Sequence, residues 1–192
     1  MAAQRGQSGI PILAGLALDA QDIFVAIADS IPQEESAPAG LVVGLNQPGW
    51  VIAHAAFFHD CWLNGDAQGR PREHWDPWLL EWAQRERGSQ EPMATELDDA
   101  RNALRRIVPG ATAFLTGLTE GDLLRVPGYE EGAWTPGTTV GYLVARSVAH
   151  LFAHASELNV IATALGRPDA GLPGRLTATR LAATADPEPT TG

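Results

Sequence analysis

Two histidines, His150 and His154, stand four residues apart within an apolar run that predicts a long helix. A spacing of four places both imidazoles on one face of the helix, one turn apart. Two neutral imidazoles in that arrangement can hold one divalent metal ion. A third histidine, His54, lies in another strongly helical segment, residues 48–64. If both helices face one bundle core, three nitrogen ligands converge and leave positions open for water or substrate, which favours a catalytic metal site over a structural one.

These three histidines could also be accommodated without a metal. A buried histidine is commonly satisfied by a carbonyl or a carboxylate. A dinuclear Glu-x-x-His site is not supported, because the residues three before the histidines are Val51, Ser147 and Leu151. A zincin motif is absent as well, since leucine follows His150. Cys61 is the only cysteine, which excludes an internal disulfide and a cysteine zinc cluster and is most consistent with a buried structural thiol.

Two charged residues flank the histidine pair on the same predicted helix. Glu157 is one turn after His154 and could orient that ring or act as a base, or it could be a solvated surface carboxylate. Arg146 is one turn before His150 and could bind an anionic group of a substrate, although a surface ion pair accounts for it equally well.

His59 lies about 140° around its helix from His54, so we expect it at the surface or behind the ligands, not among them. Tryptophans of the connecting segments are candidate walls of a cofactor or substrate pocket: Trp75, Trp78, Trp82 and Trp134.

Four long helices must position these side chains. Apolar residues recur at helical spacing in all of them, and no alternating strand pattern of useful length is present. The predicted helices span residues 12–31, 48–64, from 92 or 93 to about 115, and 139–165. Asn46 or Gln47 could cap the second helix, and Pro109 should kink or break the third. The pattern predicts an all-α four-helix bundle, with antiparallel packing as the leading arrangement.

The connection between the second and third bundle helices is long enough for a crossover and contains a short predicted helix at residues 77–87. We expect the bundle to span residues 11–168. Residues 1–10 and most of residues 169–192 have the composition of disordered segments, and glycine and proline at positions 166 and 168 mark the end of the last helix.

The overall composition excludes several classes of function. The formal net charge of -10 argues against a nucleic-acid or anionic-membrane partner. All 13 basic residues are arginines, so a lysine Schiff base or a lysine base is impossible. No signal peptide is evident, and no run approaches the roughly 20 apolar residues that span a bilayer, so we expect a cytoplasmic protein.

The sequence resembles the DinB/YfiT-like metalloenzyme superfamily, which includes mycothiol-dependent maleylpyruvate isomerase-like proteins and thiol-dependent S-transferases. The resemblance covers about residues 12–168. It is carried by Asn46-Gln-Pro-Gly-Trp-Val-Ile-Ala-His54, by Asp60-Cys-Trp62, by His150-Leu-Phe-Ala-His154-Ala-Ser-Glu157 and by Ala164-Leu-Gly-Arg-Pro168.

This resemblance implies a four-helix bundle in which His54, His150 and His154 bind a divalent metal, usually zinc or nickel. It also implies a small-molecule substrate, a thiol such as mycothiol as co-substrate, and a homodimer. The function we expect is a metal-dependent transferase or isomerase that uses a thiol or metal-activated water on a small electrophile. Two alternatives remain: a bundle that binds or cyclises a small molecule without metal, and a bundle with a purely structural metal.

Overall fold

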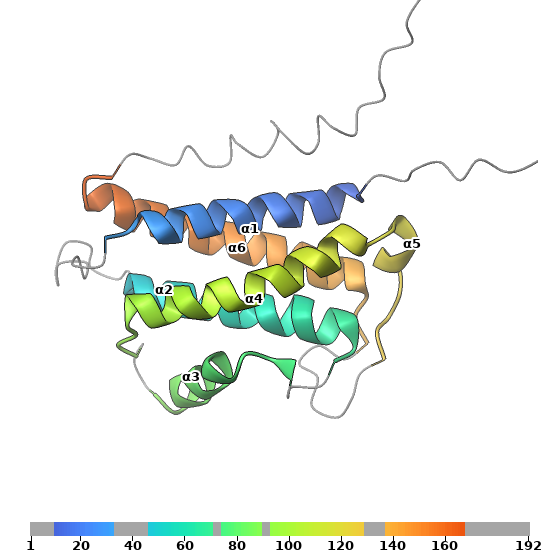
Figure 1. The fold of residues 1–192 in the computed structure, drawn as a ribbon, viewed down its shortest axis with the longest axis horizontal. Coiled ribbons are helices and arrows are strands. Elements are labelled where there is room, and N and C mark those ends of the chain that lie inside the picture. The colour runs from blue at the N-terminus through green and yellow to red at the C-terminus, as the bar shows by residue number, and fades with distance from the viewer. Residues whose placement is uncertain (1–9, 33–45, 71–73, 90–92, 129–136, 168–192) are drawn as a thin grey trace, which may run out of the picture.

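The computed structural model describes residues 10–32, 46–70, 74–89, 93–128 and 137–167. Every described element is helical (Figure 1), which confirms the predicted all-α class. Both predicted terminal tails and Trp134 lie outside the described residues. None of the described helices is both long enough and apolar enough to cross a bilayer.

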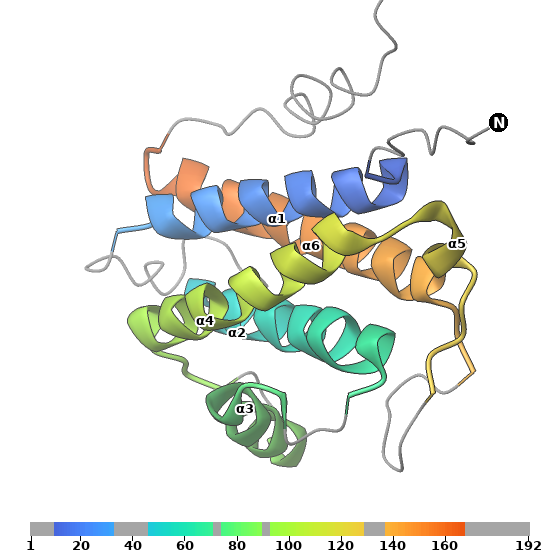
Figure 2. The ribbon, with the colours of Figure 1, turned by 45° about the vertical axis from the view of Figure 1, so that its right-hand side comes forward.

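The bundle consists of α1 (Ile12–Ser30), α2 (Pro48–His59), α4 (Leu97–Gly117) and α6 (Val140–Ala164). A π-helix, η1 (Asp60–Gly65), extends α2 and is followed by a 3-10 turn, η2 (Asp66–Gln68). The connection from η2 to α4 carries α3 (Pro77–Gly88), so the partly helical connection is confirmed. The segment between α4 and α6 contains one further short helix, α5 (Glu120–Leu123), at the end of the bundle where α4 ends and α6 begins (Figure 2).

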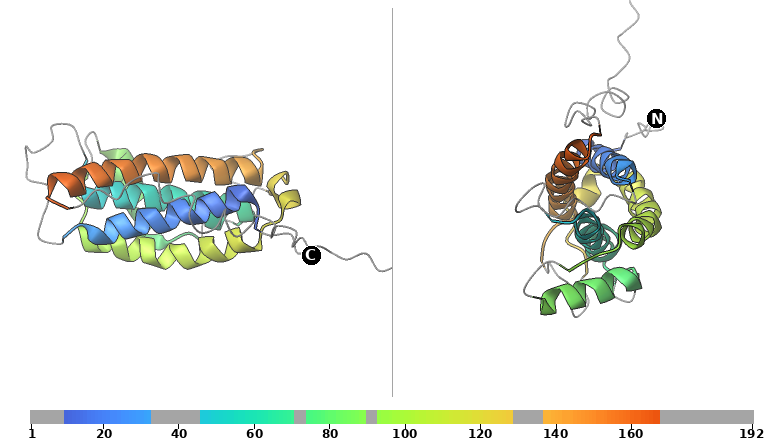
Figure 3. Two further views of the ribbon diagram at one scale, coloured as in Figure 1. Left: turned by 90° about the horizontal axis from the view of Figure 1, so that it is seen from above. Right: turned by 90° about the vertical axis from the view of Figure 1, so that its left-hand side faces the viewer.

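The four bundle helices do not pack in a purely antiparallel manner. Around the core, α6 lies between α1 and α2, and α4 lies on the other side between the same two helices (Figure 3). The neighbours α1 and α6 run in one direction, whereas the neighbours α2 and α4 both run in the other. Parallel neighbours need a connection that returns along the whole bundle. The segment containing α3 makes that return on the outside of α2, which explains why this connection is so long.

Helix ends follow the expected chemistry at α3 and α6 but not at α2. The side chains of Asp76 and Thr139 accept hydrogen bonds from the backbone N–H groups of Leu79 and Tyr142 and thereby cap α3 and α6. Pro48 starts α2, yet no side chain caps this helix. The prediction that Asn46 or Gln47 caps α2 was therefore wrong, and Asn46 makes a different contact described below.

The helix α4 continues through Pro109 without a break. The proline ring is exposed. Proline cannot donate a backbone hydrogen bond, but the packing of the inner side of α4 on α1 and α2 keeps the helix continuous.

The helix α2 is the most buried element, because α4, α6 and α3 surround it. Apolar side chains lie all round it, as expected for a helix without a solvent face. Of its residues from 48 to 59, only Trp50, His54 and Phe58 are partly exposed. These three residues are spaced four apart and form one line along the helix.

The helix α3 is fixed against the bundle at both ends. At its start, Arg106 of α4 donates two hydrogen bonds, of 2.7 and 3.1 Å, to the carboxylate of Asp76. The backbone N–H of Asp76 in turn donates to the buried carboxylate of Asp60, at 2.7 Å. Further along, the indole Nε1 of Trp82 donates to Thr95 Oγ1 at 3.0 Å. These bonds hold α3 over the side of α2 that carries His54.

Candidate metal centre

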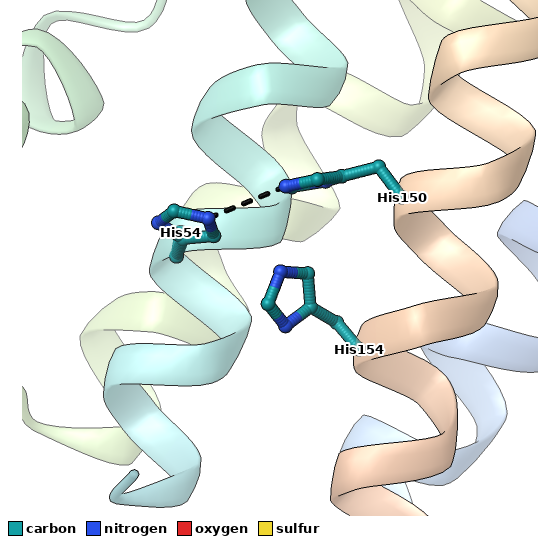
Figure 4. A group of neighbouring side chains, drawn as sticks. All are labelled: His54, His150 and His154. Atoms are coloured by element: carbon teal, nitrogen blue, oxygen red, sulfur yellow. Dashed lines mark hydrogen bonds between the residues drawn. The ribbon is translucent and has the colours of Figure 1, made fainter.

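The three histidines singled out by spacing converge in space. His54 comes from α2, and His150 and His154 come from successive turns of α6 (Figure 4). One nitrogen of each ring lies within 4.8 Å of the corresponding nitrogens of the other two. All three side chains are partly buried, so the cluster lies between the core and the surface. It is the one group of this kind among the described residues that could hold a metal ion.

The separation of two of these nitrogens fits shared coordination of one ion. The Nε2 atoms of His54 and His150 face each other at 3.3 Å. Zinc binds histidine nitrogen at about 2.0–2.1 Å, so two imidazoles on a tetrahedral ion have nitrogens about 3.3–3.4 Å apart. Three imidazoles without a carboxylate or thiolate in the cluster suit borderline ions such as zinc or nickel better than magnesium or calcium.

The surroundings keep two of the rings neutral. Burial, reinforced by the neighbouring His154, lowers the pKa of His54 to about 4. Burial, followed by the effects of His154, His54 and Arg146, lowers the pKa of His150 to about 3. Neutral imidazole is the form that binds metal, so both lone pairs are available at neutral pH without the loss of a proton.

A carboxylate and an amide orient the third ring. The Nδ1 atom of His154 lies 3.0 Å from Glu157 Oε2, and Asn46 Nδ2 donates to the other carboxylate oxygen at 3.0 Å. With Nδ1–H donating to Glu157, His154 can offer only Nε2 to a metal. A carboxylate behind a ligating histidine fixes its tautomer and increases its basicity. Glu157 is thus engaged with the cluster, and this geometry suits an orienting role better than that of a surface carboxylate.

Aromatic rings enclose the cluster. Trp50 stacks on His54 with ring centroids 4.6 Å apart, and Phe58 contacts His54 and His150 edge to face at 5.0 and 5.1 Å. Trp62 contacts His150 at 5.2 Å. The predicted wall residue Trp82 is present, with its centroid 6.5 Å from that of His54. These rings restrict imidazole motion and lower the local dielectric constant.

Of the other predicted wall tryptophans, the structure describes Trp75 and Trp78, and neither lies at the cluster. Trp75 packs against Phe57, on a different side of α2, with centroids 6.2 Å apart. Trp78, in the first turn of α3, packs on the core and makes no ring contact with the histidines among the described residues. Trp50, Phe58 and Trp62 were missed, although the spacing of four on either side of His54 could have identified the first two.

Arg146 lies beside the cluster with its guanidinium over a ring. Its Cζ atom is 4.8 Å from the centroid of Trp62, and the side chain is exposed. Among the described residues it forms no ion pair with a carboxylate, so the surface ion pair considered from the sequence is not found there. A guanidinium held over a ring by a cation–π contact keeps N–H donors available to a ligand.

His59 is neither at the surface nor behind the ligands. It is only 1% exposed, and Ser147 Oγ and Gln21 Oε1 lie 2.8 and 3.0 Å from its two ring nitrogens. Gln21 also donates to Thr112 Oγ1 at 2.8 Å, so the chain of hydrogen bonds joins α1, α2, α4 and α6. Burial lowers the pKa of His59 to about 4. The expectation of a surface position was wrong because only the line of Trp50, His54 and Phe58 is partly exposed on α2, and His59 lies on a side packed against α1 and α6.

Asp60, part of the motif Asp60-Cys-Trp62, points away from the histidines. It is buried and accepts hydrogen bonds from Asn64 Nδ2 at 2.8 Å and from the Asp76 backbone. Burial raises the pKa of this carboxyl, and the two donors act in the opposite direction. It lines an open cavity of about 310 Å³ with Asp76 and Arg106, and none of the three histidines borders this cavity. Asp60 therefore anchors α3 and takes no part in the candidate metal centre.

Comparison with known proteins agrees with this geometry. Residues 18–158 match the family model of the DinB superfamily, a range that includes all three histidines and Glu157. No curated protein and no solved structure matches the chain.

Proposed function

This chain belongs to the DinB superfamily, and on that premise we propose that it is a metal-dependent enzyme whose ion is held by His54, His150 and His154. The observation that carries the proposal is the meeting of two neutral Nε2 atoms, at 3.3 Å, from helices far apart in sequence. Without a metal, one of these two rings would donate its Nε2–H to the other, and neither ring has another hydrogen-bond partner among the described residues. His59, by contrast, has a separate partner on each ring nitrogen.

Each residue near the cluster has a role in this proposal. The three imidazoles supply three ligands and leave the remaining positions for solvent or substrate, as in catalytic zinc sites. Glu157 holds the His154 ring and its tautomer, and Asn46 holds Glu157. Trp50 and Phe58 restrict the His54 ring and exclude water from its faces. A divalent ion bound here would lower the pKa of a thiol or a water molecule and so supply a nucleophile at neutral pH.

We further propose a low-molecular-weight thiol of the mycothiol type as co-substrate, transferred to or used to isomerise a small electrophile. Zinc or nickel is the proposed ion, because three imidazoles suit both metals. Metal-activated water is the competing nucleophile. A homodimer and a small-molecule substrate remain part of the proposal.

An activity screen tests this function directly. The untagged protein is incubated with mycothiol and a panel of small electrophiles, with and without a chelator. Turnover that the chelator abolishes and that added zinc or nickel restores supports the proposal. Turnover that is unchanged by the chelator would favour the alternative of a bundle that binds or cyclises a small molecule without metal.

A structural metal gives a different pattern. Its removal would lower the melting temperature, yet the loaded protein would accept neither thiol nor azide as an additional ligand. Spectroscopy of the cobalt-loaded protein with these two ligands separates a structural ion from a catalytic one.

A further inference from the structure

We infer that Arg146 determines the specificity of the candidate metal centre, selecting a substrate that carries an anionic group, such as a carboxylate, sulfonate or phosphate. This inference rests on the proposed metal-dependent function, and it specifies that the substrate carries a negative charge. It is carried by the position of the guanidinium beside the cluster, by its lack of an anionic partner among the described residues, and by the ring that holds it.

Arg146 is fixed at the edge of the cluster by two consecutive contacts. Its Cζ atom lies 4.8 Å from the centroid of Trp62, and the Trp62 ring lies 5.2 Å from that of His150. Trp62 is itself 3% exposed and belongs to η1, so its ring is held by the core. A guanidinium stacked on a fixed ring loses little further conformational freedom when it binds a ligand.

Three arginines of α4 are already engaged. Arg105 and Arg106 bind Asp29 and Asp76, at 2.8 and 2.7 Å. Arg101 is buried and donates to backbone carbonyls of α1. Arg146 is instead exposed beside the histidines and has no ion pair among the described residues, in a chain with a formal net charge of -10. Such a chain repels anions at long range, so an unpaired cation beside the site gives local attraction where the substrate must arrive.

The arrangement suits a small ligand. Arg146 and the proposed ligand His150 both contact the ring of Trp62, so a short molecule bound to the ion comes near the guanidinium. A two-carbon thiol with a terminal anion has about this reach when the lengths of a metal–sulfur bond and a charge-assisted hydrogen bond are added.

Three thiols with the same two-carbon skeleton test the inference. Cobalt-loaded protein is titrated with 2-mercaptoethanesulfonate, 2-mercaptoethanol and 2-aminoethanethiol, and sulfur-to-cobalt absorption reports binding. We expect the anionic thiol to be preferred over the neutral one, and Arg146→Gln to reduce this preference about tenfold. Comparing ratios of dissociation constants between proteins cancels the different thiol pKa values and any change in cobalt affinity.

Two further variants complete the design. Arg167→Gln removes an exposed charge just beyond the end of α6, whose last residue lies about 15 Å along the helix axis from His154, and should leave the ratio unchanged. Arg146→Lys keeps the charge but loses the planar stacking, and should retain part of the preference. Raising the ionic strength should weaken the preference of the native protein, because the guanidinium is exposed.

The outcomes are distinguishable. If the native protein binds no cobalt, the proposed function fails and this inference fails with it. If cobalt and thiols bind but the ratio is the same in the native protein and in Arg146→Gln, the metal proposal survives and the role of Arg146 is overturned. A loss of preference in Arg146→Gln and in Arg167→Gln alike would assign the effect to net charge and also overturn it.

Discussion

Asn46 and Glu157 are 111 residues apart in sequence and are joined by a hydrogen bond of 3.0 Å. The other oxygen of Glu157 accepts from His154, so the start of α2 is connected through a carboxylate to a proposed ligand on α6. This connection fixes the position of one helix relative to the other at the point where the three imidazoles must meet.

Loss of this carboxylate should weaken metal binding. We expect Glu157→Ala to reduce affinity for zinc about 10–100-fold, as for other groups behind ligating histidines, in a competition titration with a chromophoric chelator. Glu157→Gln should lose less, because its amide oxygen can still accept from His154. The exposed Glu81→Gln serves as the control and should bind zinc as the native protein does.

Asn46→Ala should weaken zinc binding by a smaller factor in the same titration. If Asn46 acts only through Glu157, the double variant with Glu157→Ala should bind no worse than Glu157→Ala alone. Additive losses would show that the two residues act independently and would contradict the proposed connection.

The buried His59 should make the metal-free protein sensitive to acid. Its folded-state pKa of about 4 lies below the ordinary value of 6.5, so the unfolded chain takes up a proton first as the pH falls. Stability should therefore be constant above about pH 6.5 and fall between pH 6.5 and 4, with His59 contributing about 3 kcal/mol of that fall. His54 and His150 contribute in the same direction.

Urea unfolding at a series of pH values isolates the contribution of His59. In His59→Gln, the free energy of unfolding should vary less between pH 6.5 and 4 than it does in the native protein. The contributions of His54 and His150 are present in both proteins and cancel in the comparison. Parallel curves for the two proteins over this range would contradict a neutral, buried His59.

Gly65, the last residue of the π-helix, permits close packing of a tryptophan. A Cβ atom at this position would lie 2.1 Å from Trp75 Nε1, so Gly65→Ala must displace an indole that is 3% exposed. We expect this variant to lower the free energy of unfolding by about 1–3 kcal/mol in urea titrations. Gly15→Ala is the matched control, because no atom lies within 4 Å of its Cβ position and alanine favours the helix. Equal stability of the two variants would show that Gly65 is not needed for this contact.

Helical periodicity was sufficient to predict that the three histidines converge. The spacing of His150 and His154 depends only on the geometry of one helix, and His54 lies on an apolar segment that had to face the same core. Four long segments with apolar residues at helical spacing and one long connection likewise predicted the bundle. The direction of the helices was not predictable in the same way, because it depends on which neighbours pack together.

Contacts between helices limited the rest of the prediction. Nothing in the sequence pairs Asn46 with Glu157, or His59 with Gln21 and Ser147, because each pair is formed only when separate helices dock. His59 was expected at the surface or behind the ligands, because the sequence does not show that its side of α2 is covered by α1 and α6. Trp50 could have been predicted, because it lies four residues before His54 on the same face of the helix. The tryptophans of the connecting segments were chosen as pocket walls instead.

The central claim is that three histidines hold one divalent ion, and metal analysis of protein purified without an affinity tag tests it most directly. We predict about one zinc or nickel ion per chain in the native protein and none in His150→Ala. His74→Ala replaces an exposed histidine outside the cluster and should retain the full amount. A native protein that stays metal-free after incubation with either ion, or a His150→Ala variant that binds as much metal as the native protein, would contradict the account.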